Sequence, residues 1–230
     1  MKIIEVKNLV KSFKTGDKEL VVLGGMSFSV DAGEFFSIIG RSGSGKSTLL
    51  YQLGLLDHAN SGEIIIDGVN VSTLDNEERT DFRLRELGYV FQDYALVPEL
   101  SALENTVIPL LMQGLEKKAA YEKAKRALDK IGLGERLNNL PNQLSGGEQQ
   151  RVSIARAIAH DPKIIFADEP TANLDSETAD TVMKTFIDLN NTGQTIVMVT
   201  HEPEYARLTK RAMKIGDGKI LMDGSPESVM

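Results

Sequence analysis

Cysteine is absent from the 230 residues of this chain. Its absence excludes a disulfide framework and a thiolate metal site, and it suits a reducing compartment. Long apolar runs are also absent, because stretches such as 64–66 and 195–199 are far shorter than the roughly 20 residues that a membrane-spanning helix needs. We therefore expect any function at a membrane to depend on partner proteins.

The chain also lacks an excess of positive charge. Its 26 lysine and arginine residues are outnumbered by 33 aspartate and glutamate residues, so the formal net charge is −7. Binding to a nucleic-acid backbone needs a basic surface that displaces counterions, so we expect no nucleic-acid partner. Lys2, Glu5 and Lys7 place charges where a secretory signal would need its apolar segment, which predicts a cytoplasmic protein.

Hydrophobic residues make up 41% of the chain, enough for a substantial core. Short β-branched runs recur between helical stretches and predict strands at 35–39, 64–66, 89–91, 164–167 and 195–199. Because such runs show little alternation, they indicate strands buried on both faces, as in the parallel sheet of an α/β core. Residues 3–10 and 21–30 instead predict an antiparallel pair of strands that flanks a loop at 14–18.

Helical patterns replace strand patterns between residues 93 and 141. Ser101 and Glu104 predict a capping box at the start of a helix that Pro109 would bend or end. A second helix is predicted from a stripe of mostly small and apolar side chains at helical spacing: Ala120, Tyr121, Ala124, Leu128 and Ile131. We expect one domain, with an α/β core at 1–92 and 162–230, which includes an antiparallel β lobe, and a helical lobe at about 93–161.

A glycine-rich segment follows the predicted strand at 35–39. It reads Gly40, Arg41, Ser42, Gly43, Ser44, Gly45, Lys46 and Ser47, and Thr48 continues into a helix. Backbone N–H groups and the helix dipole at such a loop bind phosphate, and glycines allow the close approach. Lys46 would bind the β- and γ-phosphates, and Ser47 would coordinate Mg²⁺. A flexible turn is the alternative, but the preceding strand and the following helix favour a phosphate loop.

The predicted strand at 164–167 ends in two adjacent carboxylates, Asp168 and Glu169. Such a pair is unfavourable unless it meets cations or catalytic water. In a chain with a phosphate loop, Asp168 fits a residue that holds Mg²⁺ through a coordinated water, and Glu169 fits the group that polarises the attacking water. The sequence therefore predicts a nucleotide-hydrolysing site that uses Mg²⁺.

A second helix start suited to anions lies at Ser145, Gly146, Gly147 and Glu148. Its donors would serve best on the face of a triphosphate that the phosphate loop leaves open. The alternative is an ordinary helix that Ser145 caps and in which Glu148 completes a capping box. Local chemistry leaves both interpretations open.

Residues 144–148 resemble the signature motif of the ATP-binding cassette (ABC) superfamily, and the other motifs of that family occur in the family's order. They are the phosphate loop, Gln92 after a strand, residues 144–148, the strand that leads to Glu169, the segment 173–175 and His201. The similarity extends over nearly the whole chain. It implies a P-loop NTPase core with an antiparallel β subdomain and an inserted helical subdomain.

The resemblance implies that catalysis depends on residues distributed along the chain: Lys46, Gln92, Glu169 and His201. Gln92 would sense the γ-phosphate and contact the metal, and His201 would contact the γ-phosphate and hold the attacking water in line with Glu169. A surface glutamine at a strand end is the alternative for Gln92. His58 and His160 are expected to be structural.

The same resemblance completes the nucleotide site. Phe13 resembles the aromatic residue on which adenine stacks, with a core phenylalanine as the alternative. The implied metal ligands are Ser47, Gln92 and Asp168. The resemblance extends the phosphate contacts to residues 145–148. It also places Asp175, which ends the loop 172–175, in the nucleotide site.

Members of this family work as head-to-tail dimers, in which each ATP lies between the phosphate loop of one copy and the signature helix of the other. The resemblance implies a homodimer in the ATP-bound state that drives transmembrane permease subunits from the inner face of the cell membrane. One alternative is a soluble ABC ATPase in nucleic-acid or cluster-assembly work. Another is a membrane-complex ATPase that transmits force without a transported substrate.

Details at 53–57, 91–92, 104–105 and 172–175 resemble the lipoprotein-release and macrolide-export branch of the family. The segment 92–105 is predicted to contact a short helix of a membrane partner. It follows Gln92 and is more apolar than a free loop needs, with Tyr94, Leu96, Val97 and Leu100. Packing of these side chains between the helical lobe and the core is the alternative.

Overall fold

The computed structural model describes residues 1–16 and 18–230. Their contacts group into two compact units, with Met1–Asp81 and Gly193–Met230 in unit 1 and Phe82–Thr192 in unit 2. The expected boundaries of the helical lobe, at 93 and 161, both fall inside unit 2 and remain a prediction.

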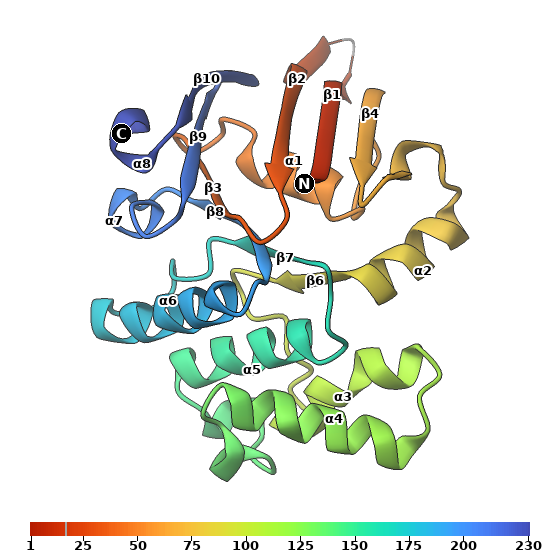
Figure 1. Cartoon of the computed structure of the whole chain (residues 1–230), viewed down its shortest axis with the longest axis vertical. Helices are drawn as coiled ribbons and strands as arrows, with labels where there is room; N and C mark the ends of the chain where they lie inside the picture. The colour runs from red at the N-terminus through yellow and green to blue at the C-terminus, as the bar shows by residue number, and fades with distance from the viewer. Residues whose placement is uncertain (17) are drawn as a thin grey trace. The chain divides into compact units, whose positions relative to one another are not determined.

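Unit 1 contains an antiparallel sheet with the strand order β2-β1-β4-β5 (Figure 1). Its strands are β1 (Lys2–Thr15), β2 (Lys18–Asp31), β4 (Ser61–Ile66) and β5 (Val69–Asn70). The antiparallel pairing of β1 with β2 is confirmed, and both strands run further than predicted. Asp17, in the expected loop at 14–18, lies outside the described residues.

The prediction that residues 64–66 join the parallel sheet is wrong. β4 pairs antiparallel with β1, where Ile64 lies opposite Val6 and Ile66 lies opposite Ile4. Ile64 and Ile66 are buried whereas Ile65 is partly exposed, so the strand buries only one face. Three consecutive isoleucines conceal this alternation, because the partly exposed position carries the same apolar residue as the buried ones.

The second sheet of unit 1 is built on β3 (Phe35–Ile39), which pairs in parallel with β8 (Thr195–Thr200) and β9 (Arg211–Gly216). β10 (Lys219–Gly224) pairs antiparallel with β9. Every residue of β3 and β8 is buried, as predicted for strands covered on both faces. The short elements of unit 1 are α1 (Lys46–Leu53), η1 (Val71–Thr73), α7 (Pro203–Ala206) and α8 (Pro226–Val229), and α2 (Asn76–Glu86) leads into unit 2.

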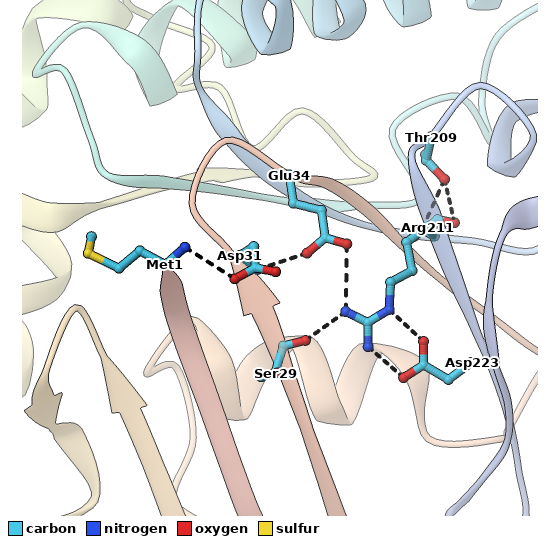
Figure 2. A network of polar contacts seen from close by, with 8 residues as sticks. Met1, Ser29, Asp31, Glu34, Thr209, Arg211 and Asp223 are labelled. Atoms are coloured by element: carbon cyan, nitrogen blue, oxygen red, sulfur yellow. Dashed lines mark hydrogen bonds and ion pairs between the residues drawn. The ribbon is translucent and has the colours of Figure 1, made fainter.

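Arg211, on β9, joins both sheets of unit 1 (Figure 2). Its guanidinium donates two hydrogen bonds of 2.6 Å to the Asp223 carboxylate on β10 and one of 2.9 Å to the carbonyl oxygen of Ser29 on β2. It also lies 3.6 Å from the Glu34 carboxylate. The bonds to Asp223 raise the pKa of Arg211, so the cation that ties the sheets together is permanently charged.

Arg211→Met should lower the free energy of unfolding by about 2 kcal/mol, because the carboxylates of Asp223 and Glu34 lose a charged donor. Urea denaturation of the purified variant measures this loss. Lys7→Met is the matched control, since the Lys7–Glu63 pair is half exposed and contributes less than about 1 kcal/mol. An equal loss of unfolding free energy in the two variants would show that Arg211 contributes no more than an exposed surface cation.

Unit 2 pairs β6 (Leu87–Val90) in parallel with β7 (Ile164–Asp168). Its helices and 3₁₀ turns are α3 (Ala102–Met112), α4 (Lys117–Lys130), η2 (Gly134–Arg136), η3 (Pro141–Gln143), α5 (Gly146–Ile158) and α6 (Ser176–Asn191). The capping box of Ser101 and Glu104 is confirmed, and α3 continues past Pro109. Helices α3, α4 and α5 pack against one another (Figure 1). Within residues 1–16 and 18–230, no helix is long and apolar enough to cross a membrane.

Candidate functional site

The loop between β3 and α1 carries the predicted phosphate-binding residues. Gly45 precedes α1 with a φ of 98°, in the left-handed region that favours glycine. A Cβ at this position would lie 2.9 Å from the carbonyl oxygen of Val22 on β2. Helix α1 can begin this close to β2 because residue 45 has no side chain, and the N-terminus of the helix lies at the loop.

Lys46 is 5% exposed, and its Nζ donates to the carbonyl oxygens of Gly40 at 3.0 Å and Arg41 at 3.2 Å. The ammonium group therefore lies across the loop. The hydroxyl oxygen of Ser44 is buried in the same loop and has no hydrogen-bond partner among the described residues. A phosphate would give both groups a charge-assisted hydrogen bond, so the residues present fit the phosphates of a nucleotide.

His201, which follows β8, lies at the same pocket as the start of the phosphate loop. Gly40, Arg41, Ser42 and His201 contribute to the wall of this pocket, which has a volume of about 460 Å³. Unit 1 therefore brings His201 next to the phosphate loop, as the proposed contact with a γ-phosphate requires. Phe13, on β1 of the same unit, is 43% exposed, so it is not a core phenylalanine.

The paired carboxylates lie in unit 2. Asp168 is the last residue of β7 and is 5% exposed, and Glu169 follows it directly. Glu169 has a φ of 43°, a left-handed conformation that is strained for a residue with a side chain. Such strain persists only where the surrounding structure enforces one conformation.

The structure contains the predicted capping box at the start of α5. The hydroxyl oxygen of Ser145 accepts a 3.2 Å hydrogen bond from the N–H of Glu148, whose carboxylate accepts one of 2.9 Å from the N–H of Ser145. The bond from the Ser145 N–H, with one from Arg136, lowers the pKa of Glu148. The cap uses the Ser145 hydroxyl as an acceptor and does not engage its proton, so a helix cap and an anion site are compatible.

Gln92 and Asp175 lie at loops of unit 2. Gln92 is exposed, and its carbonyl oxygen accepts a 3.0 Å hydrogen bond from the side-chain amide of Asn173. Asp175 caps α6 by accepting hydrogen bonds from the N–H of Thr178 at 3.0 Å and from its hydroxyl at 2.7 Å, and these lower the pKa of Asp175. The geometry gives Asp175 a capping role, and its place in the nucleotide site remains a prediction.

A family model for the ABC transporter family matches residues 23–172, a span that contains the phosphate loop, the signature segment and Asp168. The chain belongs to the ABC transporter family. It binds ATP and is an ATPase, in agreement with the prediction from the motifs.

Two curated relatives of this ABC transporter chain confirm the predicted branch. The lipoprotein-releasing system ATP-binding protein LolD of Aquifex aeolicus (strain VF5) is 52% identical over 200 residues, which cover 87% of this chain and 89% of the relative. The macrolide export ATP-binding/permease protein MacB of Aggregatibacter actinomycetemcomitans is 44% identical over 229 residues, which cover 100% of this chain and 36% of the relative.

A solved structure confirms the predicted fold of the ABC transporter chain. It is the dimeric, post-hydrolysis state of the ATP-binding cassette MJ0796 bound to ADP and Pi. The two chains are 39% identical and superpose with a TM-score of 0.89, covering 97% of this chain and 98% of that chain.

The sequence analysis of the ABC transporter chain missed the residues that hold the segment after Gln92. Tyr94 and Ala95 have φ values of 63° and 48°. Arg156, on α5, donates hydrogen bonds to both of their carbonyl oxygens, and Asn105, on α3, bonds backbone groups further along the same segment. The available signal was an arginine within an otherwise apolar run of α5.

Proposed function

We propose that two copies of this chain close around two MgATP, and that hydrolysis reopens the dimer and drives conformational change in separate transmembrane subunits. The observation that carries the proposal is the presence of two half-sites for phosphate, the loop with the buried Lys46 and the start of α5 with the hydroxyl proton of Ser145. Two incomplete anion sites in one chain complete each other when two copies pair head to tail. The dimeric state of the MJ0796 cassette supports this arrangement.

Hydrolysis would use the side chains at the ends of the buried strands. Lys46 would stabilise charge on the phosphates, Glu169 would polarise the attacking water, and His201 would hold that water near the γ-phosphate. Gln92 would contact the γ-phosphate and couple its presence to the position of the segment that follows. Loss of the bridging phosphate removes the charge that holds the two copies together, so the interface reopens.

Ser47, Gln92 and Asp168 would hold Mg²⁺. All three present oxygen ligands, which Mg²⁺ prefers, and phosphate oxygens and waters would complete its shell. Asp168 is a buried carboxylate, so a nearby cation offsets the unfavourable desolvation of its charge. The ion would neutralise charge that develops on the β- and γ-phosphate oxygens.

The membrane partner would be a separate permease chain at the inner face of the cell membrane. Support comes from the MacB relative, which is described as a combined ATP-binding and permease protein and of which this chain spans 36%. Segment 92–105 is the proposed contact. Val97 is 39% exposed, whereas Tyr94 is partly buried and its hydroxyl lies close to Gly146, so Val97 is the better apolar anchor.

Val97→Glu should leave the ATP turnover of the isolated subunit largely unchanged and abolish its copurification with the permease, because a charge is unfavourable in an apolar interface. Affinity purification of the tagged chain from its native membrane, with mass spectrometry and an ATPase assay, measures both. Leu111→Glu is the control, since Leu111 is a 40% exposed residue of α3 outside the segment. Wild-type recovery of the permease by Val97→Glu would place the docking surface elsewhere.

A further inference from the structure

Lys11 is a buried cation within the antiparallel sheet of unit 1. It is 8% exposed, and its Nζ lies 2.7 Å from the Asp57 carboxylate and 2.7 Å from the carbonyl oxygen of His58. The same Nζ lies 4.9 Å from the centroid of the Phe13 ring. Lys11 and Phe13 are two residues apart on β1, so their side chains lie on the same face of the strand.

The contact covers one side of an exposed aromatic ring. An ammonium at this distance over a ring is held by a cation–π interaction, and here two oxygens also fix the ammonium. Phe13 nevertheless remains 43% exposed. The ring is therefore supported by the ammonium and remains partly accessible to solvent, as a stacking partner for a planar base must be.

Asp57 connects this cation to the phosphate loop. Its carboxylate accepts hydrogen bonds from the side chain of Gln52 at 3.1 Å and from the N–H of His58 at 2.7 Å. Gln52 lies in α1, the helix that begins at Lys46. Burial raises the pKa of Asp57, but the hydrogen bonds from Lys11, His58 and Gln52 lower it by more. The net effect is a lowered pKa, so the carboxylate is ionised at neutral pH.

A continuous set of contacts thus runs from Phe13 through Lys11, Asp57 and Gln52 to the helix of the phosphate loop. We propose that Lys11 is a positioning residue for the nucleotide base, which holds the Phe13 ring at a fixed distance from the phosphate loop. The proposal rests on the proposed stacking of adenine on Phe13. The distance matters because base and phosphates belong to one ligand, and a ring that moves must be ordered again on each binding event.

A purely structural role for Lys11 makes a different prediction from a positioning role. The Lys11–Asp57 pair could simply stabilise β1, and its loss would then act equally on every ligand. A positioning residue acts only on ligands that carry the base and only while Phe13 is present. A double-mutant cycle with Phe13→Leu separates the two cases.

Lys11→Met should weaken MgADP binding about two- to fivefold, measured by isothermal titration calorimetry on the full chain. Displacement of ADP by inorganic pyrophosphate, which lacks the base, should give an unchanged pyrophosphate affinity. Lys11→Arg should restore ADP binding because it keeps a cation beneath the ring, and Lys7→Met, which removes an ion pair elsewhere on β1, should have no effect. In the Phe13→Leu background, Lys11→Met should cause no further loss.

An equal loss for ADP and pyrophosphate, or an additive loss in the Phe13→Leu background, would overturn the positioning role and leave adenine stacking intact. Normal ADP affinity of Phe13→Leu alone would overturn the stacking, and with it the role of Lys11. If Lys11→Met does not fold, Asp57→Asn provides the same test, because it removes the charged partner of the ammonium and keeps the shape of the side chain.

Discussion

Lys46→Ala is expected to weaken ATP binding about a hundredfold, equivalent to about 3 kcal/mol, and to abolish turnover at ordinary nucleotide concentrations. The ammonium of Lys46 is buried and held across the loop by the carbonyl oxygens of Gly40 and Arg41. Without this ammonium, the β- and γ-phosphates would lose a charged donor. Calorimetry with ATP and a phosphate-release assay measure the two effects.

The matched control for this substitution is Lys219→Ala, which removes an exposed lysine from β10 of the same unit. It should bind and hydrolyse ATP normally. A thermal melt of Lys46→Ala in the absence of nucleotide checks that the loop still folds. Near-native affinity and turnover in the folded variant would refute the phosphate-binding role of the loop.

Glu169→Gln is expected to bind MgATP normally and to lose turnover by about two to four orders of magnitude, the usual contribution of a general base. The substitution keeps the size of the side chain and removes its ability to polarise water. Because the bound ATP then persists, the closed homodimer should accumulate. Size-exclusion chromatography with and without ATP reports the dimer directly.

Glu177→Gln controls for the loss of one carboxylate, since Glu177 is an exposed residue in the first turn of α6. It should remain monomeric under the same conditions and hydrolyse ATP at the wild-type rate. A Glu169→Gln variant that hydrolyses ATP normally and never dimerises would remove Glu169 from the proposed mechanism.

The fold was predictable where a local sequence pattern is compatible with only one kind of strand or helix. The run 35–39 is apolar except for Ser37 and became β3 without change of bounds, because a strand covered on both faces shows no alternation of apolar and polar positions. The run 64–66 was assigned to the wrong sheet because its partly exposed position happens to be isoleucine. The hairpin of β9 and β10 was not predicted, since β9 has no apolar run longer than two residues.

The candidate site was predictable where its chemistry lies in adjacent residues, as in the phosphate loop and in Asp168 with Glu169. Lys11 and Arg156 were missed because their partners are distant in the chain. Lys11 meets Asp57, and Arg156 meets the backbone of Tyr94, through folding alone. No spacing rule connects such pairs, so their roles became visible only with the structure.

The left-handed backbone at Glu169 affects which substitutions are expected to accumulate at this position during evolution. A non-glycine residue at a φ of 43° costs about 1–3 kcal/mol of stability, and glycine or asparagine would relieve much of that strain. Under the role proposed for Glu169, selection for hydrolysis opposes selection for stability at this position. In a lineage that no longer needs ATP hydrolysis, we expect glycine or asparagine to replace this carboxylate early. The replacement would make the inactive descendant more stable than its active ancestor.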